Sequence, residues 1–300
     1  MPNQLLLFLD MIKFHHTLFA LPFAVVGAVY AAEGVPDLRT SLLILAAMVG
    51  ARTCAMGFNR LADHELDARN PRTADRALPR GLLSRGAVWA WTLGSAAVLF
   101  AAAAALNRLC LLLAPVALLI VLGYSYTKRF TALCHFVLGL GLACAPVGAW
   151  LAVRPIPGES IDLPAAVPFF PVLLGLAVLL WTAGFDILYA AMDVDFDRAN
   201  GVHSIPAAVG VPAALRISAG LHAATVAALA AAGRFAGLGA AWWTGVGAIA
   251  LLLAYEHAIV RPDDLRRVNR AFFAVNAVVS ITVMIASLGD LYLRHGGIIR

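Results

Sequence analysis

Two clusters of carboxylates lie at the ends of long apolar stretches of the chain. Asn59, Asp63 and Asp67 are spaced by four residues, and Asp193 and Asp197 repeat that spacing, each 130 residues after its counterpart. Residues spaced by four lie along one face of a helix. Carboxylates on one face repel each other unless a cation binds, and Mg²⁺ prefers oxygen ligands and is usually completed by phosphate oxygens. The spacing predicts two Mg²⁺ ions with an anionic ligand between them.

Basic side chains near both clusters are suited to a phosphate group. Arg72 and Arg76 follow the first cluster, and Lys128 follows a later apolar stretch. Arg forms bidentate hydrogen bonds to phosphate oxygens, so we expect a diphosphate to bind at this end of the helices. In the alternative interpretation both clusters are ordinary solvated helix ends, which their matched spacing disfavours.

Three further polar residues extend the two stripes into apolar segments. Asp186 and Tyr189 lie seven and four residues before Asp193, and Arg52 lies seven residues before Asn59. An Arg inside a membrane helix is a functional candidate by default. Arg52 either pairs with a carboxylate of the ligand or snorkels to the membrane surface, and the sequence leaves both open.

The composition predicts a membrane protein. Of the 300 residues, 62% are hydrophobic and 13% charged, which is too apolar for a soluble domain. In lipid the backbone must bond internally, so apolar runs near 20 residues predict helices. We expect an all-α bundle of nine transmembrane helices in a single domain, 1–300, whose two halves are pseudo-repeats carrying the motifs at 59–67 and 186–197. The expected spans are 14–32, 40–59, 87–106, 109–127, 130–153, 163–185, 217–233, 235–255 and 271–289.

The basic residues predict the orientation. Most of the 22 Lys and Arg residues lie in the N-terminal segment and in the connections after the second, fourth, sixth and eighth expected spans. Positive loops stay in the cytoplasm, so the N-terminus and both carboxylate motifs are expected on the cytoplasmic side of the inner membrane. This bias explains the net charge of +5 and requires no nucleic-acid partner.

At this point the sequence resembles the UbiA-type intramembrane aromatic prenyltransferases over essentially its whole length. The family carries N-x-x-x-D-x-x-x-D after its second helix, which residues 59–67 match, and D-x-x-Y-A followed by D-x-x-x-D after its sixth, which 186–197 match. The run RTADRALPRG (72–81) is similar to the family's R-T-x-x-R-P-L-P-x-G, with Ala77 in place of Pro. YSYTK (124–128) is similar to its Y-x-x-x-K.

The resemblance implies a reaction and a role for each motif. Asn59 and the four motif carboxylates would hold two Mg²⁺. Arg76, Tyr124 and Lys128 would bind the diphosphate of a polyprenyl donor, and Asp186 would polarise an aromatic acceptor or take its proton. The sequence is most similar to the bacterial quinone-pathway branch, which prenylates hydroxybenzoate or hydroxynaphthoate acids. The product would serve ubiquinone or menaquinone biosynthesis.

Two other functions are compatible with parts of the pattern. Intramembrane Asp and Arg also mark ion pathways, and a repeat is compatible with a transporter. A transporter would place its charges near the midplane, however, and here they gather at one interface. Another Mg²⁺-dependent membrane transferase, a CDP-alcohol phosphotransferase, also uses D-x-x-x-D, but its upstream D-G-x-x-A-R is missing before both motifs.

Overall fold

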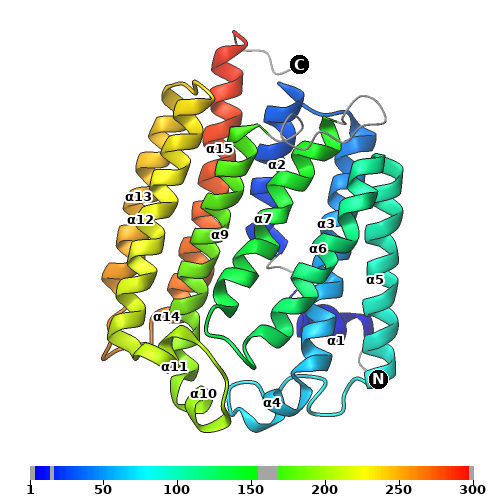
Figure 1. Ribbon diagram of the computed structural model, residues 1–300, viewed down its shortest axis with the longest axis vertical. Coiled ribbons are helices and arrows are strands. Elements are labelled where there is room, and N and C mark those ends of the chain that lie inside the picture. The colour runs from blue at the N-terminus through cyan, green and yellow to red at the C-terminus, as the bar shows by residue number, and fades with distance from the viewer. Residues whose placement is uncertain (1–3, 14–16, 155–167, 297–300) are drawn as a thin grey trace.

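The computed structural model describes residues 4–13, 17–154 and 168–296, and its elements there are helices (Figure 1). Apolar side chains form the core between the helices, with the largest cluster among α2, α7, α9, α12, α13 and α15. The helices are α1 (Gln4–Met11), α2 (Thr17–Ala32), α3 (Leu38–Ala62), α4 (His64–Arg69), α5 (Arg85–Leu106), α6 (Arg108–Thr127), α7 (Cys134–Val153), α9 (Phe169–Ala190), η2 (Ala191–Asp193), α10 (Val194–Asn200), α11 (Ile205–Val209), α12 (Val211–Phe235), α13 (Ala240–Ile259), α14 (Val268–Arg270), the π-helical η3 (Ala271–Val275) and α15 (Asn276–Arg294).

The all-helical prediction is confirmed, but the count of nine spans is not. Within the described residues, seven helices are long and apolar enough to cross a membrane: α3, α5, α6, α7, α9 with its continuation to Asn200, α12, and the helix from Phe272 to Arg294. The helix α2 has only 16 residues, and the 20-residue α13 carries Glu256 and His257 near its end. Residues 14–16 and 163–167 of the expected spans lie outside the described residues.

Glycines let neighbouring helices approach closely. A Cβ atom on Gly139 of α7 would overlap the carbonyl oxygen of Leu179 in α9, and one on Gly27 of α2 would overlap the carbonyl of Pro146 in α7. Small residues at such crossings are how helices associate in a membrane, where the hydrophobic effect gives little drive between them. These contacts fix α7 between α2 and α9.

The two carboxylate motifs occur where long helices bend. Asp63 separates α3 from α4 with φ −95° and ψ 5°, and Asp193 precedes α10 with φ −104° and ψ 8°. The backbone bonds from Asp63 N to Asn59 O (2.9 Å) and from Asp67 N to Asp63 O (2.7 Å) continue the helical pattern through the first bend. The short helices α4 and α10 both lie at the lower end of the bundle, far from the end of α15 (Figure 1).

Candidate active site

The first motif places a buried carboxylate against a lysine from another helix end. Asp63 is only 2% exposed, and its Oδ2 accepts hydrogen bonds from Asn59 Nδ2 (2.9 Å) and Lys128 Nζ (2.5 Å). Lys128 follows α6, so the contact joins α3 to α6. Asp63 Oδ1 is buried and has no hydrogen-bond partner among the described residues, although Arg129 Nη2 lies 3.7 Å away.

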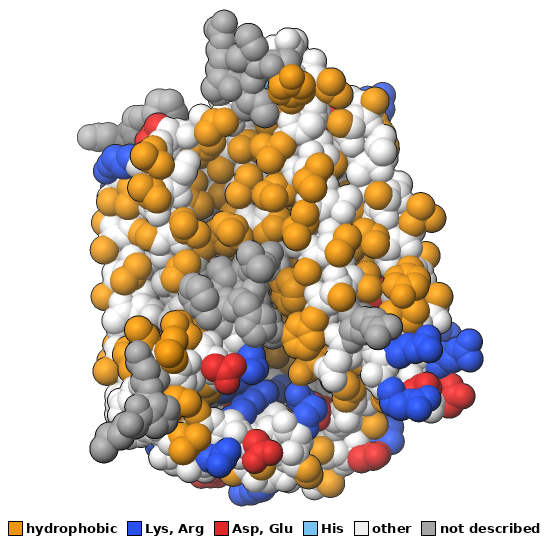
Figure 2. Space-filling model, turned by 180° about the vertical axis from the view of Figure 1, so that it is seen from behind, with side chains coloured by type: hydrophobic (Ala, Val, Ile, Leu, Met, Phe, Trp, Pro, Cys, Tyr) orange, Lys and Arg blue, Asp and Glu red, His pale blue; other side chains and the backbone are white. Residues whose placement is uncertain are grey.

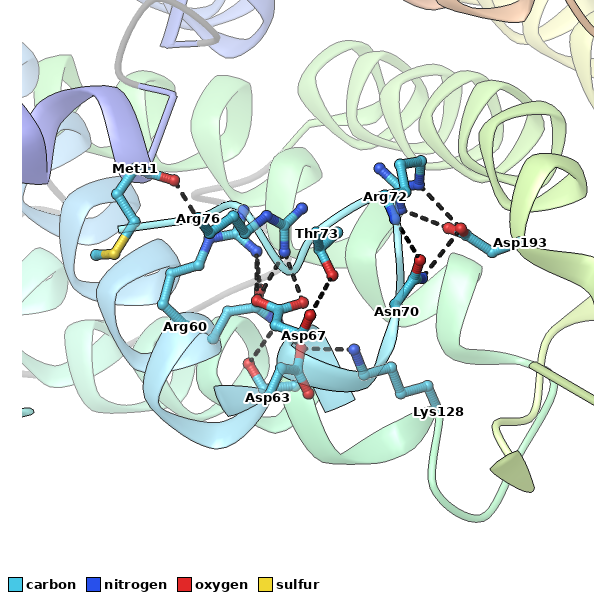
Figure 3. A network of polar contacts seen from close by, with 12 residues as sticks. Met11, Arg60, Asp63, Asp67, Asn70, Arg72, Thr73, Arg76, Lys128 and Asp193 are labelled. Carbon is cyan, nitrogen blue, oxygen red and sulfur yellow. Dashed lines mark hydrogen bonds and ion pairs between the residues drawn. The ribbon is translucent and has the colours of Figure 1, made fainter. Parts of the chain in front are cut away.

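The second carboxylate of this motif is held by arginines. Nη1 of Arg76 lies 2.7 Å from both Asp67 oxygens, and Nη1 of Arg60 lies 3.6 Å from Oδ2. The hydroxyl of Thr73 donates to the Asp67 carbonyl and ties the 70–84 loop to α4. Figure 3 shows these side chains converging from the end of α3, from α4 and from the loop that follows it.

Arg72 links the first motif's loop to the second motif. Its Nε and Nη2 donate to Asp193 at 2.9 and 2.5 Å, and its Nη1 donates to the Tyr189 hydroxyl at 2.9 Å. Asn70 Nδ2 also donates to Asp193 (3.2 Å), as Figure 3 shows. Burial alone would lower the pKa of the Arg72 guanidinium, but its hydrogen bonds to Asp193 raise it above the ordinary value. Arg72 is therefore a permanent cation between the two motifs.

One cavity of about 700 Å³ brings together every residue that the sequence singled out. On the face shown in Figure 2, apolar side chains cover the upper part, while charged side chains gather at the lower end and within a hollow. The lining includes Arg52, Asn59, Asp63, Asp67, Arg72, Arg76, Tyr124, Lys128, Asp186, Tyr189, Asp193 and Asp197. Glu65 and Asp195, which fall off the predicted stripes, are exposed.

An apolar cavity of about 240 Å³ adjoins the polar one. Arg52, Met56, Asn59 and Tyr124 line both cavities, so the two adjoin along these side chains. The Nε atom of Arg52 is buried at this junction and has no hydrogen-bond partner among the described residues. The site thus has a charged compartment, an apolar compartment and an unsatisfied guanidinium donor between them.

The wall formed by α7 and α9 carries a second polar group. Asp186 Oδ2 lies 2.7 Å from His135 Nδ1, and Ile205 N donates to the other ring nitrogen at 3.2 Å. Thr182, one turn before Asp186, is fully buried and lines the same cavity. Its hydroxyl has no hydrogen-bond partner among the described residues, whereas Thr92 and other helical hydroxyls donate to the carbonyl four residues back.

Comparison with known proteins decides the family. The model of the UbiA prenyltransferase family matches residues 20–278. The chain belongs to this family. As a UbiA prenyltransferase with seven membrane-spanning candidates among its described residues, it is an integral membrane enzyme that transfers prenyl groups, and the resemblance recognised in its motifs is confirmed.

Named relatives and solved structures agree with this assignment. The 4-hydroxybenzoate octaprenyltransferase of Xanthomonas oryzae pv. oryzae (strain PXO99A) is 34% identical over 261 residues, covering 86% of this chain and 83% of that protein. The apo structure of a UbiA homolog from Aeropyrum pernix K1 superposes with a TM-score of 0.84 at 38% identity, covering 92% of this chain and 98% of that chain. A UbiA homolog from Archaeoglobus fulgidus bound to GPP and Mg²⁺ has a TM-score of 0.66 at 21% identity, covering 94% and 99%, and shows the shared fold.

Several polar residues of this UbiA prenyltransferase's site were not found from the sequence. Arg60 directly follows Asn59 but does not share its four-residue spacing, and Asn70 lies just beyond the first motif. Ser204 donates to Asp197 Oδ2 at 2.7 Å, and it lies seven residues after Asp197, beyond the second motif. His135 and Thr182 are isolated in apolar runs, where no spacing pattern distinguishes them from core residues.

Proposed function

We propose that this enzyme transfers a polyprenyl group from a polyprenyl diphosphate to an aromatic acid in quinone biosynthesis, in a reaction that depends on Mg²⁺. One observation supports this most strongly: carboxylates from two distant motifs and basic side chains that include Arg72, Arg76 and Lys128 line one cavity, which adjoins an apolar one. A ligand with an anionic head and an apolar tail matches this pairing of a polar cavity with an apolar one.

The oxygen donors in the cavity fit Mg²⁺. Among the residues that the structure describes, no three His, Cys, Asp or Glu side chains gather closely enough to hold a metal ion by themselves. Mg²⁺ commonly takes one or two protein carboxylates and completes its shell with water and substrate phosphate. The buried Oδ1 of Asp63, without a hydrogen-bond partner in the described structure, is a ready ligand. We therefore propose that Asn59, Asp63, Asp67, Asp193 and Asp197 would hold two ions together with oxygens of the diphosphate.

The basic side chains that now neutralise the carboxylates are the proposed diphosphate ligands. Lys128 lies on Asp63, Arg76 on Asp67 and Arg72 on Asp193. Binding of the metal would free them to bind phosphate oxygens, with Tyr124 and Tyr189 as further hydrogen-bond donors. Bound Mg²⁺ supplies positive charge that stabilises the departing diphosphate.

The acceptor would lie between Arg52 and the α9 wall. The free Nε donor of Arg52 is suited to the carboxylate of an aromatic acid, which we prefer to the snorkelling alternative because Arg52 lines both cavities. The Thr182 hydroxyl, which has no hydrogen-bond partner among the described residues, is a second polar group for the acceptor, and Asp186 is the proposed group that accepts a proton from the acceptor. The name of the Xanthomonas relative makes 4-hydroxybenzoate the first acceptor to test, with dihydroxynaphthoates as the alternative.

The donor tail would enter the apolar cavity between α3, α5, α6 and α7. Small residues such as Ala47, Ala51 and Gly141 line it and leave room for a chain. Apolar walls also exclude water, so the prenyl cation formed on ionisation meets the aromatic ring before water can capture it.

The charge distribution supports a proposed placement in the membrane. We propose that α2 and α13 complete a nine-span bundle, and that the end carrying α4 and α10 faces the cytoplasm of a bacterium. The matching backbone angles at Asp63 and Asp193 support the proposal that the single domain, 1–300, consists of two pseudo-repeated halves.

An acceptor screen tests the proposal. Protein in lipid would receive Mg²⁺, a labelled polyprenyl diphosphate, and separately 4-hydroxybenzoate and dihydroxynaphthoates. We expect diphosphate release and a prenylated product with one acceptor class, and neither when the metal is chelated. No diphosphate release with any acceptor would contradict the proposed function.

A further inference from the structure

His135 is a buried polar residue near the start of α7 that none of the roles above uses. Its side chain is 2% exposed and lines the polar cavity. Nδ1 lies 2.7 Å from Asp186 Oδ2, and Nε2 lies 3.2 Å from the backbone nitrogen of Ile205. A buried imidazole with a defined partner on each nitrogen is a candidate for orienting the carboxylate.

The contact with Ile205 fixes which ring nitrogen carries the hydrogen. A backbone N–H can only donate, so Nε2 must accept and be unprotonated. In a neutral imidazole the hydrogen is then on Nδ1, where it donates to Asp186. The two hydrogen bonds of His135 therefore run in the same direction: the backbone N–H of Ile205 donates to His135, and His135 donates to the Asp186 carboxylate.

We propose that His135 is a positioning residue that holds Asp186 in the orientation in which it accepts the hydroxyl proton of the aromatic acceptor. This inference rests on the proposed function. In many enzymes a catalytic base is held in place by a further side chain, and the fold must fix that side chain in turn. Here Asp186 would be the base and His135 the side chain that holds it. Here the fold fixes the ring through Ile205, the first residue of α11.

The proton and electron balance is complete without a further reactant. The donor's allylic C–O bond breaks, and its electron pair leaves with the diphosphate. The acceptor ring forms a new C–C bond to the prenyl carbon as its hydroxyl proton passes to Asp186. The ring carbon then loses its hydrogen as a proton to the released diphosphate, the ring oxygen regains a proton from Asp186, and the carboxylate is restored.

A purely structural role for His135 predicts different behaviour. Ser204, beside Ile205, donates to Asp197, so His135 could simply tie α7 to the segment that supports the second motif. In that case the contact from Nε2 to Ile205 would matter, and the contact from Nδ1 to Asp186 would not.

Two amide substitutions separate the two contacts. The amide nitrogen of Asn superposes on Nδ1 of His, so His135→Asn keeps a donor to Asp186 and loses the contact with Ile205. The amide of Gln reaches the Nε2 position, so His135→Gln keeps an acceptor for Ile205 and loses the donor. Each variant is assayed for kcat, for KM of both substrates, and for the ratio of diphosphate released to acceptor prenylated.

We expect His135→Gln to lower kcat about 10- to 100-fold, as for a misplaced catalytic base, with the donor KM nearly unchanged. Diphosphate release should exceed product formation, because ionisation proceeds while capture by the ring fails. His135→Asn should keep most of the wild-type kcat and coupling. Since Asn lacks the Nε2 acceptor, that result excludes a purely structural role even if His135→Gln does not fold.

Two results would overturn the inference. His135→Asn being less active than His135→Gln would show that the contact with Ile205 is the important one. Wild-type kcat and coupling in both variants would show that neither contact positions Asp186. If the wild-type enzyme releases no diphosphate with any acceptor, the proposed function itself fails and this inference with it.

Discussion

Arg72 and Asp193 are 121 residues apart in the sequence and joined by two hydrogen bonds, of 2.9 and 2.5 Å. The same guanidinium donates to the Tyr189 hydroxyl, so three contacts attach the loop after α4 to the last turn of α9 and to η2. One side chain thereby connects the two carboxylate motifs across the mouth of the cavity.

This geometry predicts that Arg72→Lys is damaging although it keeps the charge. Lys cannot form the bidentate contact, and a hydrogen bond to a charged group contributes about 1.5–3 kcal/mol. We expect kcat/KM for the donor to fall about 10- to 100-fold, measured by steady-state kinetics in lipid. Arg69→Lys, at an exposed site on α4, is the control and should be unaffected.

The motif carboxylates are expected to be indispensable. Asp63→Ala or Asp193→Ala should lower turnover by at least about 100-fold while the protein still folds, as for loss of an electrostatic catalytic group. Asp195→Ala removes an exposed carboxylate from the same turn and should be mild. Near-normal activity in either of the first two variants would contradict the two-metal site.

Mg²⁺ and diphosphate are expected to bind cooperatively. Lys128 lies 2.5 Å from Asp63, so the ion must compete with the lysine unless a phosphate takes the lysine's charge. Calorimetry should show weak Mg²⁺ binding to the enzyme alone and tighter binding with an unreactive diphosphate analogue. Lys128→Met should tighten the binding of Mg²⁺ to the enzyme alone and weaken the binding of the diphosphate analogue. Identical Mg²⁺ affinity with and without the analogue would argue against this exchange.

Arg52 is expected to act on the acceptor alone. Its buried Nε lacks a partner in the described structure and faces the junction of the two cavities. Arg52→Met should raise the acceptor KM about tenfold or more, with the donor KM nearly unchanged, because a charged hydrogen bond contributes about 1.5–3 kcal/mol. An acceptor ester, which lacks the carboxylate, should bind both proteins equally; a rise in the donor KM instead would assign Arg52 to the diphosphate.

Gly139, at the crossing of α7 and α9, is expected to be required for the full stability of the folded protein. A Cβ on Gly139 meets the Leu179 backbone, which cannot move without separating the helices, so Gly139→Ala should destabilise by about 1–3 kcal/mol. Gly94 in α5 has nothing within 4 Å of its Cβ position, so Gly94→Ala should be neutral or stabilising. Thermal unfolding in detergent compares them, and equal melting temperatures would contradict the close approach.

The sequence predicted the helices from the length of the apolar runs, and it predicted that the two motifs meet from their matched spacing and their common side of the membrane. Four-residue steps placed Asn59, Asp63 and Asp67 on one face, and the continuous backbone bonds at Asp63 keep them there. The number and the bounds of the spans were predicted less well, because an apolar run does not mark the residue at which a helix begins. The run expected from residue 130, for example, is helical only from Cys134.

Contacts across the cavity could not be predicted. Arg72 was expected to bind phosphate, but its pairing with Asp193 depends on the path of an irregular loop. His135 is a single polar residue in an apolar run, and only the packing of α7 against α9 brings it to Asp186. Such pairs are set by tertiary structure, which one sequence without its relatives does not reveal.

The helical backbone bonds on both sides of Asp63 limit where insertions and deletions can be tolerated. One residue added or removed between Asn59 and Asp67 would turn the later carboxylate by about 100° around the helix and out of the cavity. The same change in the irregular 81–84 connection would shift no ligand relative to another. Insertions and deletions in descendants of this chain should therefore occur in the loops between the motifs and their neighbouring helices. Selection should remove those that fall within the motifs.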